Sequence, residues 1–443
     1  MRTTGGRSLA IAAATLMTLG LAGSASADAG DDARGAMPEQ KAMRVIAQND
    51  LGGNGNGGEG FGEVKTPDGR RILYVAHESG PTCFSVLDVT KATDPVLLSQ
   101  TDVPDENTRC NSLDVSGHLL TVANQVLEAG QPNAGLRVFD IAEPTAPREI
   151  GFFDTSGGYS RGVHYVWITD GRYAHISSGM PDFVPRRPGN DDQIYVIVDL
   201  LDATKPKEAG RWWYPGTREG DQEPLPPPNE GFDEGCRLHN VDFDQATPNR
   251  AYLGYMDCGG VVLDIANKKS PRLVASMDDS PPEVGFLHTL WPVRGGRYLV
   301  ATHESNMDSC EDYPKRNTIW SNRASGLRQV SVIPLPENAA ELCQRGGRFG
   351  AHNVFEHAAD EPTFRSDDVI FTSFFNGGVR AYDISDPRNP REVAYNIPPA
   401  PEGSPAGSVQ INDVYVDDRG LIFSVDRFAG GLYVMRSPVT QDR

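Results

Sequence analysis

Four histidines at corresponding places in the sequence are the strongest candidates for chemistry. Each is followed two residues later by an apolar side chain, in the phrases GVHYVWI, RLHNVDF, FLHTLWP and GAHNVFE. The four residues are His164, His239, His288 and His352. Neutral imidazole is the commonest metal ligand, and several nitrogen donors together suit Cu, Fe, Ni or Zn. We therefore expect a transition metal site, with Cu or Fe favoured and Zn possible.

The same position recurs in three further phrases, EGFGEVK, RCNSLDV and QINDVYV. It is occupied there by Gly62, Asn111 and Asn412. The two asparagines are expected to contact the ligand set through hydrogen bonds. A second interpretation stands beside the metal site, because duplicated units copy their residues. The whole set would then be a hydrogen-bonded polar lining without a metal.

Two copies of a shorter motif, VAHESG and ATHESN, add residues around this site. Glu78 and Glu304 are the candidate catalytic residues, because a carboxylate can orient a ligand histidine or act as general base on a bound water. His77 and His303 precede them and are expected beside the ligands. Duplicated strand ends with solvated acids are the alternative.

Arginines stand shortly before the marked position in four of the units. They are Arg109, Arg161, Arg237 and Arg348. Such cations can clamp a carboxylate or another anion. They can equally pair with Glu78, Glu304 and nearby aspartates, and this second interpretation is favoured.

A repeated phrase predicts the elements that carry these residues. A Val- or Leu-rich strand ends in Asp, a short turn follows, and a Pro precedes the next strand. Asp accepts backbone N–H bonds in the turn, and Pro is tolerated where a strand needs no ladder donor. Full copies begin at Phe84, Leu136, Ile194, Val261 and Val379, and weaker copies begin at Leu327 and Gly431.

Two further strand-like segments precede each copy, so each unit has four strands. Seven such units of roughly 59 residues predict an all-β, seven-bladed β-propeller, whose innermost strands line a channel where the histidines converge. The last unit lacks its outermost strand, and we expect residues 41–51 to supply it and close the ring. The propeller is predicted as a single domain over residues 41–437, with residues 438–443 as a tail.

The phrases VFDI, VIVDL and AYDIS, each followed by a proline-containing turn, resemble the LVIVD-repeat proteins. That family comprises exported or surface proteins of bacteria and archaea that are understood as β-propellers. The resemblance extends over most of the chain after residue 27 and implies the fold. It implies no particular activity, because a propeller hosts many chemistries.

The cysteines are predicted to lie on one face of the propeller. Cys83, Cys258 and Cys310 fall in or beside connections between second and third strands, whereas Cys110, Cys236 and Cys343 fall just before innermost strands. An even number in an exported chain indicates disulfides, and about fifteen pairings are possible. Proximity along the blades favours Cys83–Cys110, Cys236–Cys258 and Cys310–Cys343. A thiolate metal site is the alternative, weakened because no C-x-x-C spacing occurs.

The first residues of the chain predict export. Arg2 and Arg7 precede an apolar run that ends at Leu21, and an A-x-A site follows, so residues 1–27 are expected to be a cleaved signal peptide. Residues 28–40 are expected to form a flexible acidic leader. No later apolar stretch is long enough to predict a transmembrane segment. We expect a protein that is secreted or held at the cell surface.

Charge and motifs limit the function classes. A net charge of −19 opposes nucleic-acid binding. The metalloprotease motif H-E-x-x-H does not occur. If the chain is an enzyme, a metal-dependent oxidoreductase acting on a small molecule is favoured over a hydrolase. The alternative is a non-enzymatic secreted or cell-surface module that binds an envelope or surface partner. In either case we expect a monomer.

Overall fold

The computed structural model describes residues 39–228, 235–278, 280, 283, 285–358 and 361–441. The predicted signal peptide and most of the predicted leader therefore lie outside the described residues. Almost all of the regular structure is β-strand. Among the described residues there is no helix with the length and apolar character needed to cross a membrane.

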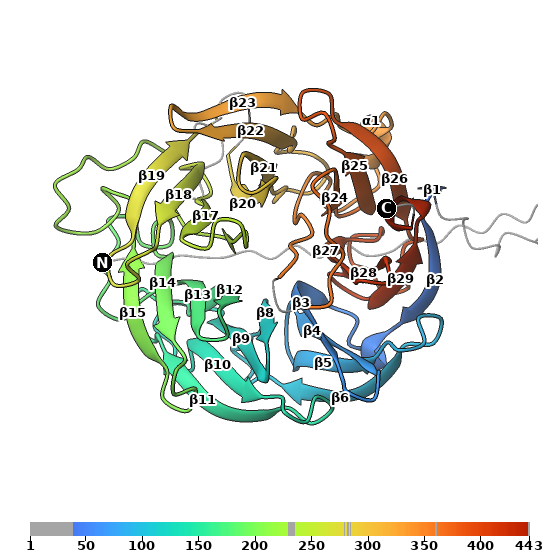
Figure 1. The fold of residues 1–443 in the computed structure, drawn as a ribbon, viewed down its shortest axis with the longest axis horizontal. Helices are drawn as coiled ribbons and strands as arrows, with labels where there is room; N and C mark the ends of the chain where they lie inside the picture. Colours follow the sequence, from blue (N-terminus) through green and yellow to red (C-terminus); the bar gives the residue numbers. More distant parts are fainter. Residues whose placement is uncertain are drawn as a thin grey trace, which may run out of the picture. The chain divides into compact units, whose positions relative to one another are not determined.

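Seven antiparallel sheets are arranged in a ring, with their strands following one another in chain order (Figure 1). The innermost strand of blade two is divided into two short pieces. Blade one contains β3 (Gly57–Lys65), β4 (Arg71–His77), β5 (Thr82–Asp88) and β6 (Val96–Asp102). Blade two contains β7 (Thr108–Arg109), β8 (Leu113–Ser116), β9 (Leu119–Val126), β10 (Gly135–Asp140) and β11 (Arg148–Asp154). Blade three contains β12 (Val163–Thr169), β13 (Tyr173–Ser178), β14 (Ile194–Asp199) and β15 (Lys207–Trp212).

The second half of the ring repeats the pattern. Blade four contains β16 (Val241–Asp242), β17 (Arg250–Gly254), β18 (Gly260–Asp264) and β19 (Arg272–Met277). Blade five contains β20 (Leu287–Val293), β21 (Tyr298–His303), β22 (Asn317–Arg323) and β23 (Gly326–Val332). Blade six contains β24 (Val369–Ser373), β25 (Val379–Asp383) and β26 (Arg391–Ile397), and blade seven contains β27 (Ile411–Val416), β28 (Leu421–Asp426) and β29 (Leu432–Arg436). Three short helices, η1 (Leu51–Gly53), α1 (Ala339–Leu342) and η2 (Pro438–Thr440), lie in connections or at the end of the chain.

The strands that complete blades six and seven come from the beginning of the described chain. β2 (Arg44–Asn49) pairs antiparallel with β29, which confirms the predicted closure of the ring by an N-terminal strand. A second strand, β1 (Glu39–Lys41), pairs with β26 in blade six. It begins within the segment predicted as a flexible leader. The seven-bladed all-β propeller predicted from the repeats is therefore the observed fold.

The repeated aspartates act as the sequence analysis expected. In each full copy the aspartate that ends the third strand accepts a hydrogen bond from the backbone N–H two residues later. The donor–acceptor distances lie between 2.8 and 3.0 Å for Asp88, Asp140, Asp199, Asp264 and Asp383. These bonds fix the tight turn that returns the chain into the outermost strand.

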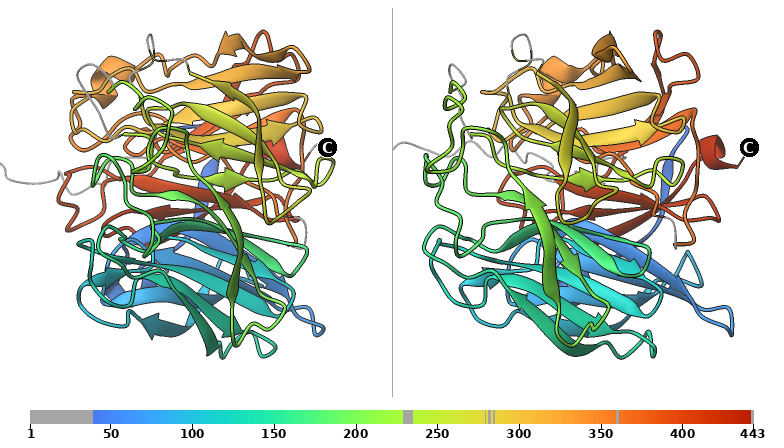
Figure 2. Two further views of the ribbon diagram at one scale, coloured as in Figure 1. Left: turned by 90° about the vertical axis from the view of Figure 1, so that its left-hand side faces the viewer. Right: turned by 60° about the vertical axis from the view of Figure 1, so that its left-hand side comes forward.

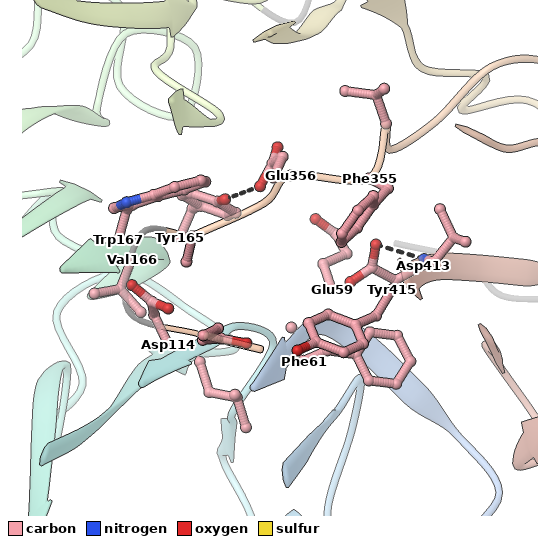
Figure 3. A pocket seen from close by; sticks show the side chains of 16 residues that line it. Glu59, Phe61, Asp114, Tyr165, Val166, Trp167, Phe355, Glu356, Asp413 and Tyr415 are labelled. Carbon is pink, nitrogen blue, oxygen red and sulfur yellow. Dashed lines mark hydrogen bonds between the residues drawn. The ribbon is translucent and has the colours of Figure 1, made fainter. Parts of the chain in front are cut away.

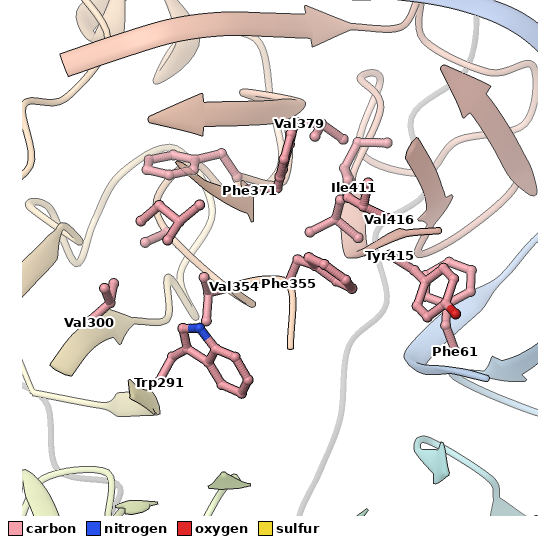
Figure 4. Packing of buried hydrophobic residues seen from close by; sticks show 14 of the residues in the cluster. Phe61, Trp291, Val300, Val354, Phe355, Phe371, Val379, Ile411, Tyr415 and Val416 are labelled. Atoms are coloured by element: carbon pink, nitrogen blue, oxygen red, sulfur yellow. The ribbon is translucent and has the colours of Figure 1, made fainter. Parts of the chain in front are cut away.

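Aromatic side chains of the inner strands fill the space between neighbouring blades (Figure 4). Tyr415 of β27 lies between Phe61 of β3 and Phe355, with ring centroids 5.9 and 5.7 Å apart respectively. Trp291 of β20 belongs to the same buried cluster. Burial of large aromatic side chains supplies much of the apolar stabilisation.

Seen from the side, the strands run between the two faces of the ring (Figure 2).

Three disulfides tie the loops together. They join Cys83 to Cys110, Cys236 to Cys258, and Cys310 to Cys343. This is the pairing that the sequence favoured, and it excludes the alternative of a thiolate metal site.

Removing the closing strands is expected to destabilise the propeller strongly. A chain that begins at Asp50 lacks β1 and β2, which exposes the backbone edge of β29. It also lacks Met43, whose buried contacts in the core are lost. We expect its thermal midpoint to fall by about 10 °C or more in differential scanning calorimetry, compared with a chain that begins at Met37. Equal midpoints for the two chains would contradict a closing role for β2.

Candidate metal centre

A β-bulge in the innermost strand places His164 and His288. In β12, Val163 pairs with Ser178 and Tyr165 with Ser177, so His164 is the extra residue. A bulge re-aims a side chain, and this one lies at the end of the strand where the channel opens. The same interruption occurs at His288 in β20 and at Asn412 in β27.

Blades four and six reach the same arrangement by backbone hydrogen bonds. The Gly254 carbonyl accepts from His239 N at 2.7 Å, while Gly254 N donates to the carbonyl of Asn240. In blade six the Ser373 carbonyl likewise accepts from His352 N, and Ser373 N donates to the carbonyl of Asn353. One backbone irregularity, repeated around the ring, therefore directs all four predicted ligands to one level.

The imidazole rings of the four histidines lie next to one another. The Nε2 atoms of His164 and His239 are 2.9 Å apart. Ring centroids are 3.8 Å apart for His239 and His288, and 4.5 Å apart for His288 and His352. The convergence that the sequence predicted is thus present in the structure.

The outer nitrogen of each ring already has an oxygen partner. His164 Nδ1 lies 3.3 Å from Gln125 Oε1, and His239 Nδ1 lies 2.8 Å from Asn240 Oδ1. His288 Nδ1 lies 2.8 Å from Thr289 Oγ1, and His352 Nδ1 lies 2.6 Å from the Asn412 carbonyl. Amide and carbonyl oxygens only accept, so at His164, His239 and His352 they place the proton on Nδ1 and leave the Nε2 lone pair for a metal. The Thr289 hydroxyl is able to accept from His288 in the same way.

Two glutamates approach the same Nε2 atoms. Glu59 oxygens lie 3.4 Å from His288 Nε2 and 3.5 Å from His352 Nε2. Glu304 oxygens lie 3.7 Å from both His239 Nε2 and His352 Nε2. The ligand atoms of Glu59, His239 and His288 lie within 4.8 Å of one another, as do those of His288, Glu304 and His352. Nitrogen and carboxylate donors at such spacing can hold a metal ion.

Several of these atoms have no hydrogen-bond partner among the described residues. They are Glu59 Oε2, His288 Nε2 and His352 Nε2, and both side-chain polar atoms of Asn111. Buried polar atoms without partners are costly, so an arrangement that keeps several of them together favours a bound cation. A shared proton could satisfy the close pair of His164 and His239, but it would leave the other atoms unsatisfied.

Burial favours the neutral form of His164, His239 and His288. It lowers the pKa of His239 to about 3, and it lowers the pKa values of His164 and His288 as well. Burial by itself would raise the pKa of Glu59, but the neighbouring His352 and His288 lower it well below its usual range. Neutral imidazoles beside ionised carboxylates are the protonation states that metal binding requires.

Glu59 was missed by the sequence analysis, and the reason is register. The phrase EGFGEVK places Gly62 at the position that corresponds to the histidines. In the structure His77 pairs with Gly57 just as His303 pairs with Leu287, so Gly58 is the counterpart of His288 and Gly62 is not. The glycine-rich run lies in β3, and its bulge carries Glu59 into the channel.

Close packing explains the glycines beside Glu59. A Cβ at Gly58 would lie 2.5 Å from the Asn111 carbonyl oxygen, and one at Gly57 would overlap the side chain of Val425. Only glycine allows the backbone to approach so closely. A lone carboxylate among glycines was the available signal for this residue.

The arginines pair with acids, as the favoured interpretation expected. Arg109 lies 2.6 Å from Glu78, and Arg427, which the sequence analysis did not select, lies 2.6 Å from the same carboxylate. Arg348 lies 2.9 Å from Glu304. Glu78 is therefore held in two ion pairs, and Glu304 is the candidate that the structure brings to the histidines.

The remaining arginines share one aspartate. Arg237 Nε lies 2.9 Å from Asp192 Oδ1, whereas Arg161 Nε lies 3.7 Å from Asp192 Oδ2. Together with Arg109, Arg348 and Arg427, these side chains line a cavity of about 140 Å³ that also contains His164 and His239.

Of the residues predicted beside the ligands, Asn412 contacts the histidine site and His77 does not. His77 has its own partners, Asn56 Oδ1 at 2.7 Å and Ser85 Oγ at 2.8 Å, and does not join the four histidines. His303 Nδ1 lies 3.2 Å from the carbonyl of Gly285. Asn412 contacts the site through its carbonyl, which accepts from His352, and through its amide, which lies 3.5 Å from Glu78.

A second cavity of about 50 Å³ lies on the other side of Glu59 and is rich in acids (Figure 3). Asp114, Glu356, Glu361 and Asp413 line it together with Glu59. The Glu356 carboxylate accepts hydrogen bonds from the Tyr165 hydroxyl and from Asn240 Nδ2. Burial raises the pKa of Asp114 to about 7 and those of Glu361 and Asp413 well above the usual range. Glu361 and Asp413 therefore favour the protonated form at neutral pH, whereas Asp114 titrates close to it.

The fold and the channel define the class: a β-propeller with a histidine- and glutamate-lined centre. The LVIVD repeat family model matches residues 112–155 and 249–279, which belong to blades two and four. The chain therefore contains LVIVD repeats, as its repeated phrases indicated. No curated protein matches the chain.

The acid cavity gives the protein a predictable pH dependence. Asp114 has a pKa of about 7 when folded and about 3.9 when unfolded, so its contribution to stability is greatest below the lower value and is lost as pH rises through 7. Between pH 5 and 8 the native protein should lose about 2 kcal/mol more free energy of unfolding than the Asp114→Asn variant. Denaturant unfolding at both pH values checks this, and parallel losses in the two proteins would contradict it.

Proposed function

We propose that the protein binds one transition metal ion in its channel. Its ligands are the Nε2 atoms of His164, His239, His288 and His352, together with carboxylate oxygens of Glu59 and Glu304. The observation that carries the proposal is that all four outer nitrogens have oxygen partners while the inner ones converge. A lining built only for hydrogen bonds would also have paired the Nε2 atoms of His288 and His352, which have no hydrogen-bond partner among the described residues.

Copper or iron is the favoured ion, and zinc is possible. Imidazole nitrogen suits all three ions. Carboxylate oxygen is a harder donor than a thiolate, so its presence favours iron more than a site of soft ligands would. A structural zinc site is typically closed by four ligands. The donors here adjoin a cavity of about 140 Å³ that a small molecule can enter, which favours a reactive centre.

The reaction class that we assign is a metal-dependent oxidation. A small substrate gives two electrons and two protons to dioxygen, which becomes hydrogen peroxide. Bound copper or iron supplies the redox step that amino-acid side chains cannot perform. Glu59 lies between the ligand set and the acids Asp114 and Asp413, and can therefore pass protons between them.

The rival function is a non-enzymatic binding module at the cell surface. In that case the channel is a polar lining, and the loops contact an envelope partner. The two functions differ in one measurable property, which is stoichiometric metal that survives dialysis.

The remaining proposals concern the whole chain. Residues 1–27 act as a cleaved signal peptide and residues 41–437 form the propeller domain, with residues 438–443 as a tail. The protein is secreted or held at the cell surface as a monomer. Three disulfides support this location, because they persist in oxidising compartments.

Metal content tests the proposal directly. Protein purified from an exporting host without chelator should contain about one equivalent of Cu or Fe per chain by elemental analysis, with a matching electron paramagnetic resonance signal. The His239→Ala/His288→Ala double variant should lose at least nine-tenths of it. Such a preparation would then be screened for oxygen consumption and peroxide formation.

The exposed His118 provides the matched control. His118→Ala removes an imidazole outside the channel and should keep the full metal content. If the native protein holds only trace metal even after reconstitution with Cu or Fe, the metal centre is refuted and the binding module remains.

A further inference from the structure

The cavity above the histidines carries positive charge within a strongly acidic protein. Five arginines line it, against three glutamates, in a chain of net charge −19. The arginines are Arg109, Arg161, Arg237, Arg348 and Arg427. Asp192 adds one further negative charge through its pairs with Arg161 and Arg237. A concentration of one sign in a cleft attracts small ions of the opposite sign.

Four of the guanidinium groups are fixed by acids and amides. Arg109 also donates to Gln125 Oε1 at 2.6 and 2.9 Å, and Arg237 donates to Gln193 Oε1 at 2.8 Å. Arg427 donates to Asn412 Oδ1 at 3.1 Å, and Arg348 pairs with Glu304. These contacts hold the forks in place before any ligand arrives, which lowers the entropic cost of binding.

Arg161 is different. Its acid partner among the described residues, Asp192, is 3.7 Å away, and its Nε lacks a hydrogen-bond partner within the described parts of the chain. Its side chain is 30% exposed and lines the same cavity as His164. A guanidinium has five N–H donors in a planar fork, which matches a carboxylate.

The other lining residues indicate the kind of anion. Met256 and Phe286 are buried apolar side chains in the same wall, and Phe286 lies 5.6 Å from His239 between ring centroids. A cation beside an apolar wall fits a molecule with a carboxylate at one end and a short carbon chain at the other. The modest volume of about 140 Å³ restricts it to a small molecule.

We infer that this cavity binds a small organic carboxylate, anchored by Arg161 and placed beside the histidine cluster. The inference deepens the proposed function by naming its substrate class and rests on it for the chemistry. The anchoring itself depends on the guanidinium groups and occurs with or without a metal.

Calorimetric titration of the full chain with propionate tests the anchor. Metal-free and metal-loaded protein should both bind propionate saturably, and propionamide, the uncharged analogue of the same shape, should not bind. Arg161→Gln should weaken propionate binding at least tenfold, and Arg161→Lys should give an intermediate loss because it keeps the charge but not the fork. Inorganic phosphate should bind more weakly than propionate.

The control is Arg272→Gln, which removes an arginine whose side chain is 76% exposed on β19. It should leave propionate binding unchanged. Equal affinity for propionamide, tighter binding of phosphate, or an unchanged affinity in a folded Arg161 variant would overturn the inference. Propionate binding by a protein that takes up no metal would support the anchor and refute the metal centre, whereas metal uptake without propionate binding would do the reverse.

Discussion

Closure of the ring by the pairing of β2 with β29 is the constraint on which the rest of the structure depends. Seven innermost strands can face a common axis only when the first and last blades meet. The pairing joins the start of the described chain to its end, and Ser437 Oγ adds a hydrogen bond to the Ala42 carbonyl at 2.6 Å. With the ring closed, one bulge repeated at one register brings side chains from four blades together.

Electrostatics then divides the channel into contiguous parts. Guanidinium groups surround the mouth, the histidines follow together with two glutamates of lowered pKa, and acids of raised pKa line the cavity beyond Glu59. Each part avoids a buried, unbalanced charge in a different way: by ion pairs at the mouth, and by protonation in the acid cavity. In the histidine layer Glu59 Oε2, His288 Nε2 and His352 Nε2 have no hydrogen-bond partner among the described residues, and a cation would balance them.

Local patterns predicted the elements well because the signals are short-range. An aspartate at a strand end makes its hydrogen bond two residues away, as at Asp88 and Asp383, so the turn is encoded where it occurs. Repetition then multiplied a weak signal into seven blades and placed His164, His239, His288 and His352 at equivalent positions. The disulfide partners followed from the same repeat, since Cys236 and Cys258 belong to one blade and the other pairs to neighbours.

The sequence by itself thus determined the fold class, the closing strand, the cysteine pairs and the four histidines. Only the tertiary structure decided that Glu59 joins them, that His77 binds Asn56 and Ser85 instead, and that Arg161 lacks the close ion pair of its neighbours. Those outcomes depend on bulge register and on close backbone contact between blades. Such contacts join residues far apart in the chain, and no local periodicity encodes the distance between them.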